Sequence, residues 1–142
     1  MVRVARSPEP LILKKIMLAH LRQHIATILA SVRNVTLATN GPAGLQAQIV
    51  PCAAEGLRLL LLVPPTSDQL LNLEAGAAVV VTSPTWQVWG HARVLAAAER
   101  PAAVSTLDAP DGVWCTVVEV RPTRVAIAHL EGWGAAETID LD

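Results

Sequence analysis

The chain has 142 residues, a formal net charge of −1 and 52% apolar residues. This length predicts a single domain, residues 1–142, that is large enough for a substantial core. The near-neutral charge and the scattered basic residues argue against nucleic-acid binding. No apolar run approaches the roughly 20 residues that span a membrane. Lys14 and Lys15 interrupt the apolar N-terminal segment, which is not typical of a signal peptide.

The N-terminal part of the chain has helical periodicity. We expect residues 1–9 to be loosely held. From residue 11 to residue 32, apolar side chains recur at spacings of three and four, which predicts a helix that packs by one face. The residues of this stripe are Leu18, Leu21, Ile25, Ile28, Leu29 and Val32.

The pattern in the rest of the chain predicts short strands separated by turns. The expected strands are 35–39, 45–54, 57–63, 77–82, 86–97, 113–120 and 123–128. The continuous apolar run 57–63 predicts burial on both faces. A short helix is expected to run to residue 75 with Ser67 as its N-cap, and another at 100–107. The glycines at 132 and 134 indicate a flexible tail. Short, evenly spaced strands favour an antiparallel barrel or sandwich.

Five motifs follow one another in an informative order. They are Leu37-Ala-Thr-Asn-Gly-Pro-Ala-Gly44, Ile49-Val-Pro-Cys52, Thr66-Ser-Asp-Gln-Leu-Leu-Asn-Leu73, Trp86-Gln-Val-Trp-Gly-His-Ala-Arg-Val94 and Val117-Val-Glu-Val-Arg-Pro-Thr-Arg-Val125. This order resembles the pyridoxamine 5′-phosphate oxidase-like family of FMN-binding split barrels. The resemblance implies a mainly β (α+β) fold, an antiparallel split β-barrel with an N-terminal helix and short connecting helices. It also implies a homodimer with its cofactor clefts at the subunit interface.

The resemblance also assigns residues to the cofactor FMN. The phosphate would lie at Thr66 and Ser67, and further contacts would come from Gln48, Ile49, Val50, Gln69 and Trp89. The family usually carries Arg or Lys at the two positions after Ser67, where this chain has Asp68 and Gln69. Losing two charged hydrogen bonds would remove about 3–6 kcal/mol of binding free energy. We therefore expect weak FMN binding unless another cation substitutes.

The candidates for that cation are arginines elsewhere in the chain, on the same or on a second subunit. They are Arg58, Arg93, Arg121 and Arg124. None can be chosen from the sequence alone.

The segment 86–97 alternates between two faces. Trp86, Val88, Gly90, Ala92 and Val94 would share one face, and Gln87, Trp89, His91, Arg93 and Leu95 the other. The second face would line a ligand groove, a subunit interface or simply the solvated outside of the barrel. Trp133, between two glycines, would cover a flavin ring, contact a partner subunit or anchor the tail.

The cysteines and histidines give little sign of a metal site. Cys52 and Cys115 lie among apolar neighbours in expected strands, which predicts buried free thiols and agrees with a reducing cytoplasm. His20 and His24 are four residues apart on the expected helix, a spacing that can bind a metal. No third ligand lies near them in the sequence, and we interpret them as part of a polar helix face.

The leading hypothesis is an FMN-binding, flavin-dependent oxidoreductase-like protein of unknown substrate. The flavin would perform the redox step, because the sequence contains no side chain with an evident catalytic role. A second hypothesis is a split-barrel dimer that has lost FMN and binds another ligand, such as a deazaflavin or haem. A third is a dimer with only an interaction or structural role. Fold alone does not decide among them.

Overall fold

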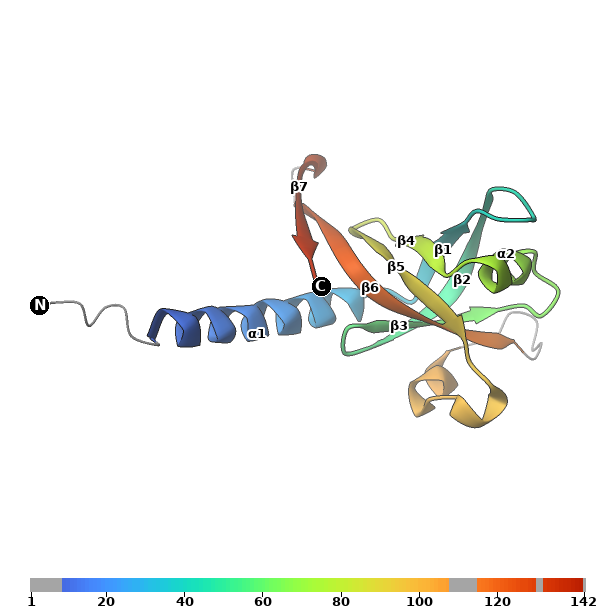
Figure 1. Ribbon diagram of the computed structural model, residues 1–142, viewed down its shortest axis with the longest axis horizontal. Helices are drawn as coiled ribbons and strands as arrows, with labels where there is room; N and C mark the ends of the chain where they lie inside the picture. Colours follow the sequence, from blue (N-terminus) through green and yellow to red (C-terminus); the bar gives the residue numbers. More distant parts are fainter. Residues whose placement is uncertain (1–8, 108–114, 130–131, 142) are drawn as a thin grey trace, which may run out of the picture.

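The strands of this chain close into a barrel (Figure 1). The computed structural model describes residues 9–107, 115–129 and 132–141, with side chains described for 12–107, 115–128 and 138–141. Its elements are α1 (Glu9–Leu29), β1 (Asn34–Thr39), β2 (Gln46–Glu55), β3 (Arg58–Val63), α2 (Gln69–Ala75), β4 (Ala78–Thr82), β5 (Trp86–Val94), η2 (Ala97–Glu99), η3 (Ala102–Thr106), β6 (Thr116–His129) and β7 (Gly132–Asp140).

All strand pairs among the described residues are antiparallel. The sheet runs in the order β3-β2-β1-β4-β5-β6-β7, and β3 also pairs with β6, so that the first six strands form a closed ring. β7 continues the sheet beyond β6. The expected antiparallel split barrel with an N-terminal helix is therefore confirmed.

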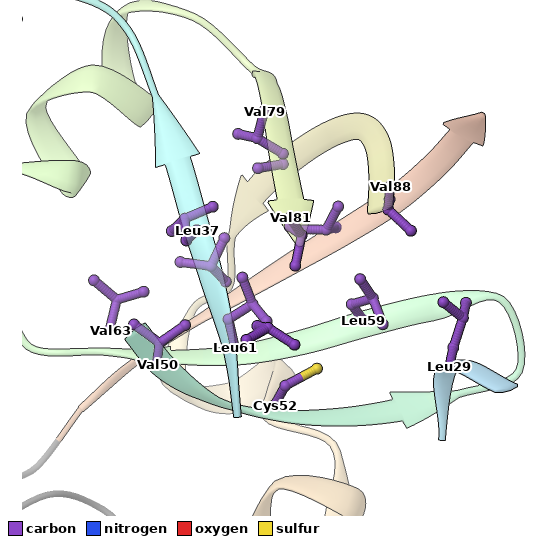
Figure 2. Close-up of a cluster of buried hydrophobic side chains, with 14 of the residues drawn as sticks. Leu29, Leu37, Val50, Cys52, Leu59, Leu61, Val63, Val79, Val81 and Val88 are labelled. Carbon is purple, nitrogen blue, oxygen red and sulfur yellow. The ribbon is translucent and has the colours of Figure 1, made fainter. Parts of the chain in front are cut away.

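Strand β3 is buried on both faces, as its apolar run predicted. Leu59, Leu61 and Val63 point into the barrel, where they meet side chains of β1, β2, β4 and β5 (Figure 2). Leu60 and Leu62 point outward and are covered by a second cluster that includes Val104 of η3. The main core is aliphatic apart from Cys52 and Trp86, and Trp86 is fully buried within it.

Only the C-terminal part of α1 packs on the barrel. Ile25 and Leu29 are fully buried in the main core, whereas Leu18 is 47% exposed because the helix extends past the end of the barrel (Figure 1). The helix also begins at Glu9, within the segment expected to be loose, and ends at Leu29, three residues before the expected boundary. No helix among the described residues is long and apolar enough to cross a membrane.

The strand boundaries differ from the expectations in three places. The two expected strands 113–120 and 123–128 form one strand, β6. The segment expected to open a flexible tail contains β7, which pairs with β6. β5 ends at Val94, which is exposed instead of lying on the inner face with Trp86 and Val88, and Leu95 stays on the outer side, where the second cluster buries it. The 100–107 segment forms the short 3₁₀ helix η3, with Pro101 at its N-cap.

Gly90 explains how β6 continues through Pro122. The register between β5 and β6 shifts at Trp89 and Gly90, where Gly90 lies opposite Pro122. A Cβ atom on Gly90 would lie 2.4 Å from the carbonyl oxygen of Arg121. Only glycine allows this close approach of the two strands. The packing of β5 on β6 therefore explains why the motif has glycine at this position.

Candidate functional site

A corner formed by β2, the loop after β3 and the start of α2 brings two predicted site segments together. The Ser67 hydroxyl donates a hydrogen bond of 2.8 Å to Gln48 Oε1. It also accepts one of 3.2 Å from the backbone N–H of Gln69. Gln48 and Ser67 are half-buried, and Thr66 and Asp68 are exposed. We call these four residues, Gln48, Thr66, Ser67 and Asp68, the β2–α2 corner.

The expected N-cap lies one residue further along. The helix begins at Gln69 and Asp68 occupies the N-cap position, but the Asp68 side chain makes no capping hydrogen bond. The Ser67 hydroxyl instead accepts the bond from the first helical N–H. The backbone N–H groups of Thr66 and Asp68 have no hydrogen-bond partner among the described residues. Together with the Thr66 hydroxyl, they are the donors that this corner can offer to an anion.

Gln69 is an internal structural residue in this arrangement. Its side chain is 1% exposed. Its Nε2 donates a hydrogen bond of 2.9 Å to the Leu37 carbonyl, and its Oε1 accepts a hydrogen bond from the Thr39 hydroxyl. A side chain bonded inward at both ends is turned away from the exposed part of the corner. A lysine at this position would have to bury a charge among β1 residues, which is costly.

Asn72 completes the attachment of α2, and the sequence interpretation assigned it no role. Its Nδ2 donates to Thr39 Oγ1 at 3.0 Å and to the Gly44 carbonyl at 2.9 Å, while its Oδ1 accepts from the Ala43 N–H at 2.9 Å. A Cβ on Gly41 would lie 2.8 Å from Asn72 Oδ1, so the turn needs glycine there. The Asn-Leu pair of the motif was the available signal: a polar residue on the buried face of a short helix.

The other predicted contacts on β2 alternate in direction. Ile49 is 72% exposed on the outside of the barrel, and Val50 is buried in the core. Val50 can therefore offer only backbone atoms to a ligand. The only Gln48 side-chain hydrogen bond in the described part of the structure is the one from Ser67.

Three of the four candidate arginines gather around one buried carboxylate at a different place. Glu119, on β6, is 2% exposed and accepts hydrogen bonds from Arg58 at 2.5 Å and from Arg121 at 3.2 Å. Arg93 approaches it to 3.7 Å. Burial by itself raises the pKa of Glu119, but the Arg58 hydrogen bond and the charge of Arg121 outweigh it and leave that pKa lowered. A charge inside the apolar run of β6 was the sequence signal for this cluster.

The outer face of β5 carries the remaining predicted residue, Trp89. Arg124 lies over the Trp89 ring, 5.8 Å from its centroid, and is paired with Asp140 at 2.8 Å. A shallow pocket of about 390 Å³ beside Trp89 includes Leu45, His91 and Thr123 in its lining. In the sheet order, β5 is three strands from β2. β2 and β5 therefore lie on opposite sides of the closed ring, and Trp89 and Ile49 are not on neighbouring strands.

The remaining expectations concern thiols, histidines and Trp133. Cys52 and Cys115 are free and buried, as expected. Burial raises the pKa of Cys52 from 9.0 to about 12. His20 and His24 belong to no group of three or more His, Cys, Asp or Glu within the described residues that could hold a metal. The side chain of Trp133 lies outside the described residues.

Comparison with known proteins identifies the fold of the chain. No family model matches the sequence, and no curated protein matches it. Among solved structures, a Clostridium acetobutylicum protein related to general stress protein 26, of the pyridoxinephosphate oxidase family, matches with a TM-score of 0.57 and 14% identity, over 84% of this chain and 93% of that one. The chain thus has the split-barrel fold of the pyridoxamine 5′-phosphate oxidase-like proteins.

Two further structures with this fold differ in the ligand that they are named for. A FAD-binding protein from Mesorhizobium loti matches with a TM-score of 0.58 and 16% identity, over 70% of this chain and 87% of that one. A heme binding protein from Mycobacterium smegmatis matches with a TM-score of 0.59 and 21% identity, over 84% of this chain. This chain spans only 57% of the length of that protein.

Proposed function

We propose that this protein binds FMN at the β2–α2 corner and acts as a flavin-dependent oxidoreductase-like protein. The observation that carries the proposal is the hydrogen bond of 2.8 Å between Ser67 and Gln48. It joins the two segments that the family resemblance assigns to the cofactor. The fold shared with a FAD-binding protein supports the same conclusion.

The donors at the corner fit a phosphate group, but its charge does not favour one. The Thr66 hydroxyl and the N–H groups of Thr66 and Asp68 would hold the phosphate oxygens, since they have no other partner in the described structure. The exposed carboxylate of Asp68 would repel the phosphate. The hydrogen bonds of the corner involve no arginine or lysine among the described residues. Binding should therefore be weaker than at a site with a basic residue in this loop.

A charge reversal at the corner tests this directly. Asp68→Arg removes the repulsion and adds a charged donor, which is worth about 1.5–3 kcal/mol. FMN should then bind at least about 10-fold more tightly, as measured by quenching of flavin fluorescence. The control is Glu74→Arg, which makes the same charge change at an exposed position on α2. Equal tightening in both variants would show that the phosphate is not held at this loop, and absence of FMN binding to all three proteins would refute the proposal.

We also propose that the protein is a homodimer. The outer face of β1, β4 and β5 carries the half-buried Trp89 and the pocket beside it, and Leu45 and Ile49 expose large apolar side chains near its edge. Exposed apolar surface of this kind favours association. Sedimentation should give a dimer at micromolar concentration, and Trp89→Ala should weaken it. A wild-type monomer under these conditions would contradict this proposal.

Haem is the second candidate ligand, because a heme binding protein shares the fold over 84% of this chain. Titration with haemin would distinguish haem from flavin, since binding to a protein shifts and sharpens the intense absorption band of haemin. A band shift that saturates at one equivalent per chain, with no FMN binding, would favour haem over FMN. A protein that binds a deazaflavin, or a dimer with a purely structural role, would bind neither haemin nor FMN in these titrations.

A further inference from the structure

A pocket with arginines from three elements lies beside the turn between β2 and β3. It has a volume of about 410 Å³, and its lining includes Arg22 of α1, Glu55, Arg58, Arg121 of β6, Pro122 and Leu141. The polar side chains are separated in the sequence but converge on this one concave surface. Pro122 and Leu141 give it an apolar wall.

Two of these arginines leave most of their hydrogen-bond donors unused. Arg58 has both Nη atoms bonded, one to Glu119 and the other to Glu55, each at 2.5 Å. Arg121 uses only Nε, toward Glu119 at 3.2 Å. Arg22 uses only Nη2, toward the Leu141 carbonyl at 2.9 Å. Both Nη groups of Arg121, and Nε and Nη1 of Arg22, have no partner among the described residues.

The carboxylates around the pocket do not neutralise its arginines. Glu119 is shared by Arg58, Arg121 and Arg93, and Arg93 is also paired with Glu99 at 2.8 Å. With Arg22 and Glu55 included, four arginines face three glutamates among the residues that the structure describes here, an excess of one positive charge in that set. Since Glu119 is buried beneath the arginines, an anion arriving from solvent would meet the guanidinium groups of Arg121 and Arg22 first.

This pocket is separate from the β2–α2 corner. Arg58 begins β3, and Ser67 follows the opposite end of the same strand. At about 3.3 Å per residue, the two ends of this strand are roughly 17 Å apart. Figure 1 shows the same separation, with the β2–β3 turn on the side of α1 and the α2 helix on the far side of the barrel.

We propose that this pocket binds a small organic anion, independently of any flavin. Its carboxylate or phosphate group would accept hydrogen bonds from Arg121 and Arg22, because planar guanidinium groups match such oxyanions. A short apolar body would lie against Pro122 and Leu141. The ligand would then connect α1, β6 and the segment after β7. This site goes beyond the proposed function and uses none of its residues.

Calorimetric titration with phenyl phosphate and with benzoate tests the site in the full chain. The two probes share a ring and differ in the anionic group, so they distinguish a phosphate ligand from a carboxylate ligand. Saturable binding of either at one equivalent per chain is expected, with inorganic phosphate weaker than phenyl phosphate. Absence of saturable binding of both aromatic probes would overturn the proposal.

Variants then locate the binding. Arg121→Gln and Arg22→Gln should each lower the affinity for the probe by about 10-fold or more, which is the contribution of one charged hydrogen bond. Arg33→Gln removes the same charge from an exposed residue outside the pocket lining and should leave binding unchanged, as should Ser67→Ala. Equal weakening by Arg33→Gln and Arg121→Gln would show general charge attraction and overturn the site. Arg58 is left intact because its removal would leave Glu119 without its shortest ion pair, and thermal melting verifies that each variant is folded.

Discussion

Removing the Asn72 side chain should loosen α2 and with it the β2–α2 corner. Asn72 makes three hydrogen bonds, to Thr39, Gly44 and Ala43, and is 1% exposed. Each such bond contributes about 0.5–1.5 kcal/mol net, so Asn72→Ala should lower the free energy of unfolding by about 1.5–4.5 kcal/mol. Water can reach the Ala43 and Gly44 groups more easily than Thr39, so a value of about 3 kcal/mol is expected.

Urea unfolding measures this loss. For a slope of about 1–3 kcal/mol per molar urea, the midpoint should fall by about 1–3 M. Glu74→Ala, at an exposed position on the same helix, is the matched control and should change stability by less than about 0.5 kcal/mol. If the two variants unfold alike, the buried network does not hold α2, and the structural reason given for the Asn-Leu motif is wrong. FMN binding, where present, should weaken in Asn72→Ala alone.

Two further predictions concern the barrel itself. Gly90→Ala should lower the melting temperature by about 4–10 °C, because its Cβ would meet the Arg121 carbonyl at 2.4 Å. Gly76→Ala, where no atom lies within 4 Å of the added Cβ, should not lower it. Equal melting temperatures for the two variants would contradict the close approach of β5 and β6. The pKa of Cys52 is raised to about 12 by burial, so stability should fall as pH rises from about 9 to about 12, by about 1.4 kcal/mol per unit. Cys52→Ala should flatten this alkaline slope in urea unfolding, and an unchanged slope would refute the assignment.

The parts of the barrel that the sequence predicted are those where the pattern of apolar residues is compatible with only one arrangement of the strand. The apolar run of β3 required cover on both faces, and the structure supplies it from the barrel interior and from η3. The alternation of β5 likewise predicted its inner face up to Ala92. Periodicity could not predict where α1 lies along the barrel. The stripe from Leu18 to Val32 is regular, but only the end that meets the barrel is buried.

Local turn signals were misleading where tertiary contacts override them. Pro122 suggested a break between two strands, but Gly90 on the neighbouring strand makes room for it and β6 continues. The glycines near residue 133 suggested a tail, but the segment pairs with β6 as β7. The candidate site stays a prediction, although two of its residues, Gln48 and Ser67, are joined by a hydrogen bond. The inward direction of Gln69 depends on Thr39 and Leu37, which are distant in the sequence.

The visible absorption spectrum of the purified protein, before and after adding FMN, is the sharpest test of flavin binding. We expect FMN in the presence of the protein to show a shifted, structured flavin band and to stay with the protein through gel filtration at high protein concentration. Asp68→Arg should retain more flavin than the wild type under the same conditions. A spectrum identical to that of free FMN, with all flavin eluting separately from both proteins, would contradict the proposed function.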